Sequence, residues 1–136
     1  MSRTVARDQV FQLVFGFIFT GEKDDINFAI SMENLTLTED DKNYIQNTYQ
    51  GVMEHYDEII KIIEPRINGF TLQRLEKARL AAIIIGVYDI MYNKISPEEC
   101  ISPVVDLVKK YGADDEGKSS GYVNAVLRSM VRDKII

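Results

Sequence analysis

The chain has 136 residues, of which 46% are apolar and 27% charged, so we expect one globular domain and not a disordered chain. Its single cysteine, Cys100, excludes an intrachain disulfide, and no apolar stretch is long enough to span a membrane; both fit a reducing, cytoplasmic compartment. The formal net charge of −5 argues against strong autonomous binding of nucleic acid, because attraction to phosphates needs a positive field. A local basic patch, or binding through a partner, stays compatible with this charge.

The first part of the chain has the apolar spacing of helices. Over residues 5–18 apolar side chains recur every three to four positions, which predicts a helix that Gly21 can close. We expect a short second helix over residues 25–33 and a loop over residues 34–37. No segment here or later in the chain shows convincing strand alternation.

A long amphipathic segment follows. Thr38 offers an N-cap oxygen, and the three acidic residues after it suit the positive end of a helix. From Ile45 to Ile63 the segment carries the clearest apolar stripe of the chain. We expect this helical segment to end at Pro65, which cannot continue a helix.

The middle of the chain predicts a buried helix. Thr71 is expected to cap it, and residues 80–87 are apolar on every side, as in a helix at the centre of a domain. Residues 83–85 also have strand propensity, but the long helical segments on both sides favour a helix.

Two further helices are expected after a turn over residues 94–100. Ser102 and Pro103 form a suitable N-cap and first position for a helix that Gly112 stops. Residues 112–121 are an acidic loop rich in glycine and serine. The last helix is expected to be capped by Ser119 or Ser120 and to turn inward Tyr122, Val123, Val126, Leu127 and Met130.

The prediction is therefore an all-α fold of six to seven helices joined by short loops. We expect an N-terminal subdomain of about residues 1–70 and a C-terminal subdomain of about residues 71–136, packed together as one domain.

Catalytic motifs are weak in this sequence. The single histidine, His55, lies between Glu54 and Tyr56 on a helix, and nothing connects it with Cys100 as a base with a nucleophile. There is no His-Glu-x-x-His motif and no cysteine cluster, so we expect no catalytic residue, metal or cofactor.

One segment matches the phosphate-loop pattern GxxxxGK[ST], from Gly112 to Ser119. Its interior holds Asp114, Asp115 and Glu116, whose carboxylates would repel a triphosphate. The segment before it is helix-like, where a phosphate loop needs a strand. We therefore interpret these residues as a polar loop between helices and keep a nucleotide-dependent enzyme only as a remote hypothesis.

Basic residues occur at both ends of the chain. Arg3 and Arg7 are four apart and share one helix face. If the first and last helices pack side by side, these arginines could form one basic strip with Lys109, Lys110, Lys118, Arg128 and Arg132.

Six segments occur in an order and spacing that resemble one family. They are residues 2–8 with 11–15, 49–52, 70–75, 86–90, 106–112 and 121–127. Residues 106–112, for example, read DLVKKYG, and residues 121–127 read GYVNAVL. Together the segments resemble the NusB family of bacterial transcription antitermination factors along nearly the whole chain.

The resemblance implies a fold of two perpendicular three-helix bundles with an extra helix, and a function without catalysis. Members of this family bind boxA RNA of ribosomal RNA operons with the small-subunit ribosomal protein that acts as NusE, and they join the RNA polymerase antitermination complex. Both monomers and homodimers occur. The RNA contacts would map to Arg3, Arg7, Gln12, Phe15, Lys118, Ser119, Ser120, Tyr122 and Asn124. For Tyr122, base stacking and core packing stay equal alternatives. The partner contacts would map to Arg79, Ile83, Asp89, Ser102 and Asp106.

Several positions depart from the family pattern. Thr4 and Val5 separate the two arginines where many members have further basic residues, and Gly121 replaces a lysine. The C-terminal half also differs, at Arg79, Ile84, Ser102 and Pro103. The alternative hypothesis is thus a divergent helical adaptor that binds a protein partner without recognising a specific RNA.

Overall fold

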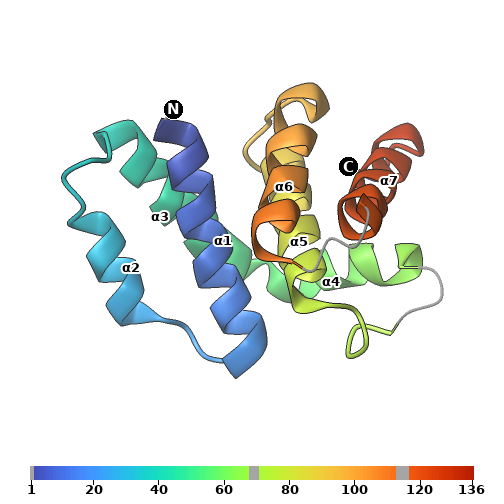
Figure 1. Ribbon diagram of the computed structural model, residues 1–136, viewed down its shortest axis with the longest axis horizontal. Helices are drawn as coiled ribbons and strands as arrows, with labels where there is room; N and C mark the ends of the chain where they lie inside the picture. Colours follow the sequence, from blue (N-terminus) through green and yellow to red (C-terminus); the bar gives the residue numbers. More distant parts are fainter. Residues whose placement is uncertain (1, 68–70, 113–116) are drawn as a thin grey trace.

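The computed structural model describes residues 2–67, 71–112 and 117–136, and in these ranges the chain is all-α (Figure 1). The described ranges hold seven α-helices, within the predicted six to seven, and a short 3-10 helix over Glu64–Arg66 follows the fourth. None of the described helices is long and apolar enough to cross a membrane. The helices are α1 (Ser2–Thr20), α2 (Asp25–Met32), α3 (Glu39–Glu54), α4 (Tyr56–Ile63), α5 (Lys77–Met91), α6 (Pro97–Tyr111) and α7 (Lys118–Arg132).

Helix α5 is the centre of the packing. Residues 80–89 are all buried, which confirms the prediction from their apolar character. The helix contacts α1, α3, α4, α6 and α7, so apolar side chains on all its faces find partners. Burial on every side also explains why the strand propensity of residues 83–85 does not prevail. Because α5 contacts helices on both sides of residue 70, the division into two subdomains stays a prediction.

Two glycines allow neighbouring helices to approach α5 closely. A Cβ atom on Gly51 of α3 would lie 1.7 Å from the hydroxyl oxygen of Tyr88, and one on Gly86 of α5 would lie 2.8 Å from a methyl carbon of Leu127 in α7. Both distances are far below van der Waals contact. The absence of a side chain at these positions therefore sets how tightly α3 and α7 pack against α5.

Several helix ends agree with the sequence. The Thr38 hydroxyl accepts a hydrogen bond from the Asp41 backbone N–H at 3.1 Å and caps α3. Gly21 follows α1 with a φ of 77°, and its N–H donates to the Phe17 carbonyl. Gly112 is the C-cap of α6. These predictions are confirmed.

The amphipathic segment is not one helix. It divides at His55 into α3 and α4, where His55 has a φ of −102° and a ψ of 15°. The imidazole stacks on the Tyr92 ring at the end of α5, with 4.5 Å between the ring centroids. The apolar stripe continues across the break into Ile59 and Ile63, so its periodicity gave no sign of the division.

The predicted starts of α5 and α6 are wrong. Thr71 caps a turn, in which its hydroxyl accepts from the Arg74 N–H, and α5 begins only at Lys77. Helix α6 begins at Pro97, with the Ser96 hydroxyl accepting from the Glu99 N–H, so Ser102 and Pro103 lie inside the helix. The chain contains two Ser-Pro pairs with the same N-terminal signature, and the prediction used the second one.

The start of α7 also differs from the prediction. Its N-cap is Gly117, in the left-handed region with a φ of 79°. Ser119 and Ser120 lie in the first turn of α7 and are buried, and the Ser120 hydroxyl donates to the Gly117 carbonyl at 3.2 Å. A glycine cap leaves no side-chain signal in the sequence, whereas Ser119 and Ser120 carry the usual N-cap side chain.

Candidate nucleic-acid interface

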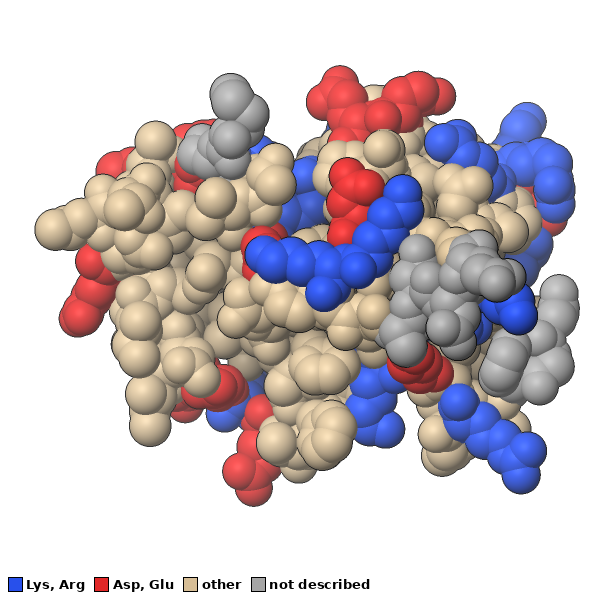
Figure 2. All heavy atoms as spheres, viewed as in Figure 1, with Lys and Arg blue, Asp and Glu red and all other residues tan. Residues whose placement is uncertain are grey.

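A polar cluster joins α1 to α6 on one face of the molecule. The Asp8 carboxylate of α1 accepts hydrogen bonds from Lys110 Nζ at 2.5 Å, from Gln12 Nε2 at 2.8 Å and from the Tyr111 hydroxyl. Gln12 Nε2 also donates to the Tyr111 hydroxyl at 3.0 Å. Figure 2 shows basic side chains lying across the middle of this face, over the C-terminal part of α6, with carboxylates beside them. We call these four residues the Asp8 cluster.

Aromatic rings extend the same side of α1. The Phe11 ring stacks on Tyr111, with 4.9 Å between centroids, and on Phe15, with 5.9 Å. Phe19 continues the row at 6.2 Å from Phe15 and is 68% exposed. Partly exposed rings next to hydrogen-bonding groups are suited to stacking on unpaired bases.

Arg3 lies near the start of α1 and is only partly exposed. Its guanidinium pairs with Asp40 at 2.9 Å and with Asp41 at 3.5 Å, both in the first turn of α3. It also lies over the Tyr44 ring, with 4.4 Å from Cζ to the centroid. Arg3 can therefore offer its charge to an incoming phosphate only in competition with these carboxylates.

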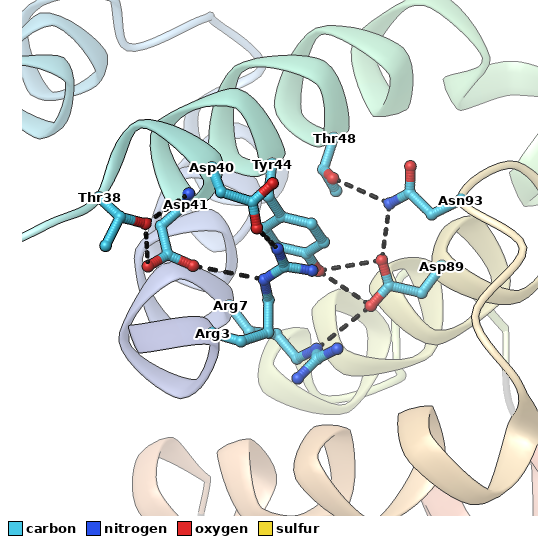
Figure 3. A network of polar contacts seen from close by, with 9 residues as sticks. All are labelled: Arg3, Arg7, Thr38, Asp40, Asp41, Tyr44, Thr48, Asp89 and Asn93. Carbon is cyan, nitrogen blue, oxygen red and sulfur yellow. Dashed lines mark hydrogen bonds and ion pairs between the residues drawn. The ribbon is translucent and has the colours of Figure 1, made fainter. Parts of the chain in front are cut away.

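Arg7 lies inside the molecule, contrary to what a surface role would need. Its Nε donates to the Asp89 carboxylate of α5 at 3.2 Å, and both side chains are buried. The Tyr44 hydroxyl lies 2.9 Å from each carboxylate oxygen, and Asn93 links Asp89 to Thr48 (Figure 3). We call these five residues the Asp89 network; it connects α1, α3 and α5.

The charges of the Asp89 network stabilise one another. Burial by itself would lower the pKa of the Arg7 guanidinium, but the nearby Tyr44 and Asp89 raise it above its usual value. Burial, together with the Asp89 carboxylate, raises the pKa of the Tyr44 hydroxyl, so it remains a donor at all physiological pH values. Arg7 is therefore held as a cation in the interior.

The candidate residues at the start of α7 form a separate group. Lys118 is exposed, and Tyr122 and Asn124 are partly buried, whereas Ser119 and Ser120 are buried. Arg79 of α5 donates to the Ser119 hydroxyl at 3.1 Å and lies over the Tyr122 ring at 5.2 Å from the centroid. Asn124 accepts from Arg128. The two serines thus shape the start of the helix, and Tyr122 packs against the core while remaining partly exposed.

The five predicted partner residues do not lie on one surface. Ile83 and Asp89 are 0% exposed in the centre of α5, so direct contact with a partner would require the core to open. Ile84, a departure from the family pattern, is also fully buried. Ser102 and Asp106 are exposed one turn apart on α6, and Arg79 is partly exposed. Only these last three side chains are accessible.

The predicted basic strip does not form. Helix α6 lies between α1 and α7 (Figure 1), and α1 packs mainly against α3 and α5. Arg3 and Arg7 are therefore separated from Lys118, Arg128 and Arg132 by the breadth of α6. Lys110 is the basic residue of the predicted strip that α6 brings to α1.

The candidates for catalysis lie on different elements, Cys100 in α6 and His55 between α3 and α4. Cys100 is buried, its Sγ lies 3.7 Å from the Gly86 carbonyl, and burial raises the pKa of the thiol to about 12, so it is protonated at neutral pH. His55 lies at the junction of α3 and α4. Asp114, Asp115 and Glu116 of the phosphate-loop pattern lie outside the described residues. Within the described ranges, no group of three or more His, Cys, Asp or Glu side chains could hold a metal.

Sequence reasoning named Gln12 and Lys110 but did not predict the Asp8 cluster. Asp8 and Gln12 are four apart, which is a signal for one helix face, and Gln12 was a candidate. The donors to Asp8 from Lys110 and Tyr111 lie more than a hundred positions further along the chain. Only the packing of α1 on α6 brings them to Asp8, and no local pattern predicts this contact.

The fold and this surface define a class: small all-helical domains that present polar and aromatic side chains on helix faces. The model of the NusB family matches residues 4–132. The transcription antitermination protein NusB of Thermoanaerobacter pseudethanolicus is 31% identical, with 98% of this chain and 93% of that protein covered. The same protein of Ruminiclostridium cellulolyticum is 30% identical, with 93% and 86% covered. The chain belongs to the NusB family.

A solved structure agrees over the whole length. The crystal structure of the antitermination factors NusB and NusE in complex with double-stranded RNA contains a chain that superimposes with a TM-score of 0.83. The two chains are 27% identical, and the match covers 97% of each. The all-α architecture predicted from the sequence is thus that of a known antitermination factor.

Proposed function

We propose that this protein is a non-enzymatic transcription antitermination factor of the cytoplasm. It binds boxA-type RNA of ribosomal RNA operons together with the ribosomal protein that acts as NusE, as part of the RNA polymerase antitermination complex. The observation that carries the proposal is the full-length match to a NusB chain in a structure that also contains NusE and RNA. The resemblance over residues 4–132 to the NusB family supports it.

The RNA-binding side chains that we propose are those the fold leaves accessible. On α1 they are Arg3, for phosphate, and Gln12 and Phe15, for base edges and stacking. On α7 they are Lys118, Tyr122 and Asn124. The buried candidates Arg7, Ser119 and Ser120 support these groups by holding α1 and the first turn of α7 in place.

For the protein partner we propose a surface on the C-terminal half. Ser102 and Asp106 are exposed on one side of α6, and Arg79 lies beside the start of α7. Ile83 and Asp89 would contribute only by fixing the position of α5 beneath this surface. A partner that binds α6 and an RNA that binds α1 would then be neighbours, since these two helices are in contact.

The test is a binding measurement with boxA RNA and a scrambled RNA of equal length, at several salt concentrations, with and without the ribosomal protein. We expect tighter binding to boxA RNA, and a larger preference when the partner is present. Equal, weak binding to both RNAs even with the partner would reject the proposal and leave the divergent adaptor.

A matched pair of variants locates the RNA surface. Arg3→Gln should weaken binding and reduce the slope of log K against log salt by up to about 0.7, the value for one phosphate on a single strand. Lys61→Gln removes the same charge from an exposed position on α4 and should change neither quantity. The same loss in both variants would show that Arg3 acts only through the net charge.

A further inference from the structure

The Asp8 carboxylate is surrounded by donors that an RNA phosphate would also use. A lysine ammonium, a tyrosine hydroxyl and a glutamine amide all point to its two oxygens, from α1 and from α6. The Asp8 side chain is only 13% exposed, whereas that of Lys110 is 61% exposed. A ligand that approaches from solvent therefore meets Lys110, whose charge is already paired with the less exposed Asp8 carboxylate.

Asp8 is held by several hydrogen bonds and not by a single contact. Exposed ion pairs with a single contact are weak, because water and salt compete for both charges. Here burial tends to raise the pKa of Asp8, but its hydrogen bonds from Lys110, Tyr111 and Gln12 lower it overall, so the carboxylate stays ionised at neutral pH. The same contact raises the pKa of Lys110.

We propose that Asp8 is a built-in competitor for RNA: by neutralising Lys110 next to the α1 surface, it keeps the affinity for phosphate low and limits binding to unspecific RNA. The inference rests on the proposed function, whose RNA surface includes α1. The geometry distinguishes Asp8 from Asp40, the exposed partner of Arg3. Asp40 is 85% exposed at the α3 terminus and can swing away, whereas three donors from two helices hold Asp8.

Removal of the Asp8 charge should therefore raise the affinity for RNA, whereas a substitution of a residue that only supports the fold should lower it. In Asp8→Asn the amide oxygen can still accept from Tyr111 or Gln12, so the shape of the cluster is retained while its negative charge is lost. Lys110 is then free to neutralise one more phosphate. Affinity for RNA should rise about fivefold at 0.1 M salt, and the salt slope should steepen by about 0.7.

The experiment uses the full chain and compares the parent, Asp8→Asn, Lys110→Gln and the double variant, with a scrambled RNA and with boxA RNA. Lys110→Gln should have little effect in the parent, and it should abolish the gain in the Asp8→Asn background, which is a coupling between the two sites. Glu98→Gln removes one negative charge from an exposed position in the first turn of α6 and controls for net charge. Thermal unfolding shows whether the amide of Asp8→Asn alters the fold. If it does, Asp8→Ala provides the same charge change without the amide.

The outcomes separate this inference from the proposed function. Unchanged or weaker RNA binding by a folded Asp8→Asn, or an equal gain in Glu98→Gln, overturns the role of Asp8. A gain that is the same with scrambled and boxA RNA, in a protein that never prefers boxA, supports Asp8 as a competitor and rejects the specific function. A gain with a retained preference for boxA supports both.

Discussion

Among the ion pairs that connect α1 to neighbouring helices, those of Arg7 and Asp8 differ mainly in burial. Arg7 and Asp89 connect α1 to α5 with side-chain exposures of 6% and 0%, while Asp8 and Lys110 connect α1 to α6 with exposures of 13% and 61%. The α1 members of the two pairs, Arg7 and Asp8, are adjacent in the sequence. The chemistry is alike, yet water and a ligand can reach only the second pair.

Because of this difference in burial, we expect the two pairs to have different roles. A buried ion that loses its partner cannot be compensated by water, so the inner pair is expected to act on the stability of the fold. An exposed pair contributes little to stability, since solvent can take over either charge. The same accessibility lets an RNA phosphate compete for Lys110, so the outer pair is expected to act on binding.

The largest effect is expected from breaking the inner pair. Asp89→Ala leaves Arg7 buried without an anion and also removes the acceptor of Tyr44 and Asn93. We expect the free energy of unfolding to fall by roughly 3–5 kcal/mol, measured by urea denaturation. Asp133→Asn, which breaks the exposed pair with Arg66, should cost much less. Similar losses for the two variants would contradict the distinction drawn from burial.

A smaller effect is expected from removing one hydrogen bond to the inner carboxylate. Tyr44→Phe keeps the ring under Arg3 but deletes the hydroxyl that lies 2.9 Å from both Asp89 oxygens. The free energy of unfolding should fall by roughly 1.5–3 kcal/mol, the usual contribution of a hydrogen bond to a charged group. Tyr92→Phe deletes an exposed hydroxyl that bonds Glu58 and serves as the control, with little change expected. If both variants unfold alike, the Tyr44 bond does not contribute as its burial indicates.

The two pairs also show what the sequence can and cannot predict. Helix α5 and the apolar face of α1 follow from periodicity, because each depends on residues a few positions apart. The same spacing placed Arg3 and Arg7 on one face, and both do lie near the Tyr44 ring. That this face packs on α3 and α5 instead of facing solvent depends on Asp89, 82 positions from Arg7, so the burial of Arg7 could not be predicted.

Helix starts illustrate a second limit. Ser96-Pro97 and Ser102-Pro103 have the same local signature, and the chain uses the first as a cap. The second pair sits within a helix in which Ile101 and Val104 are buried against the core, so tertiary packing decided between equal local signals. Of the candidate site, the sequence identified Gln12, and Lys110 only as part of a basic strip; it did not identify Tyr111 or the contact with Asp8, since the packing of α1 on α6 joins distant segments.

The smallest effect is expected from titrating the outer pair. Three hydrogen bonds hold the pKa of Asp8 below its usual value of 3.8, although burial alone would raise it. The carboxylate's contribution to stability is therefore fully present above the pKa of the unfolded chain, and it disappears as the pH falls through the lower pKa of the folded protein. Between pH 5 and 8 the stability difference between the parent and Asp8→Asn should stay constant, and below about pH 4 it should shrink toward zero.

This titration can be measured by urea denaturation at each pH, with NMR following the Asp8 carboxyl carbon. Lys110→Gln should move the pKa of Asp8 upward, toward its usual value, because it removes the nearest cation. The carboxyl resonance should respond to that substitution and not to Lys61→Gln, which lies on α4. A stability difference that grows as the pH falls would mean that Asp8 is held as the acid and not as the ion. In that state it could not neutralise Lys110, and the outer pair would no longer control access of RNA to α1.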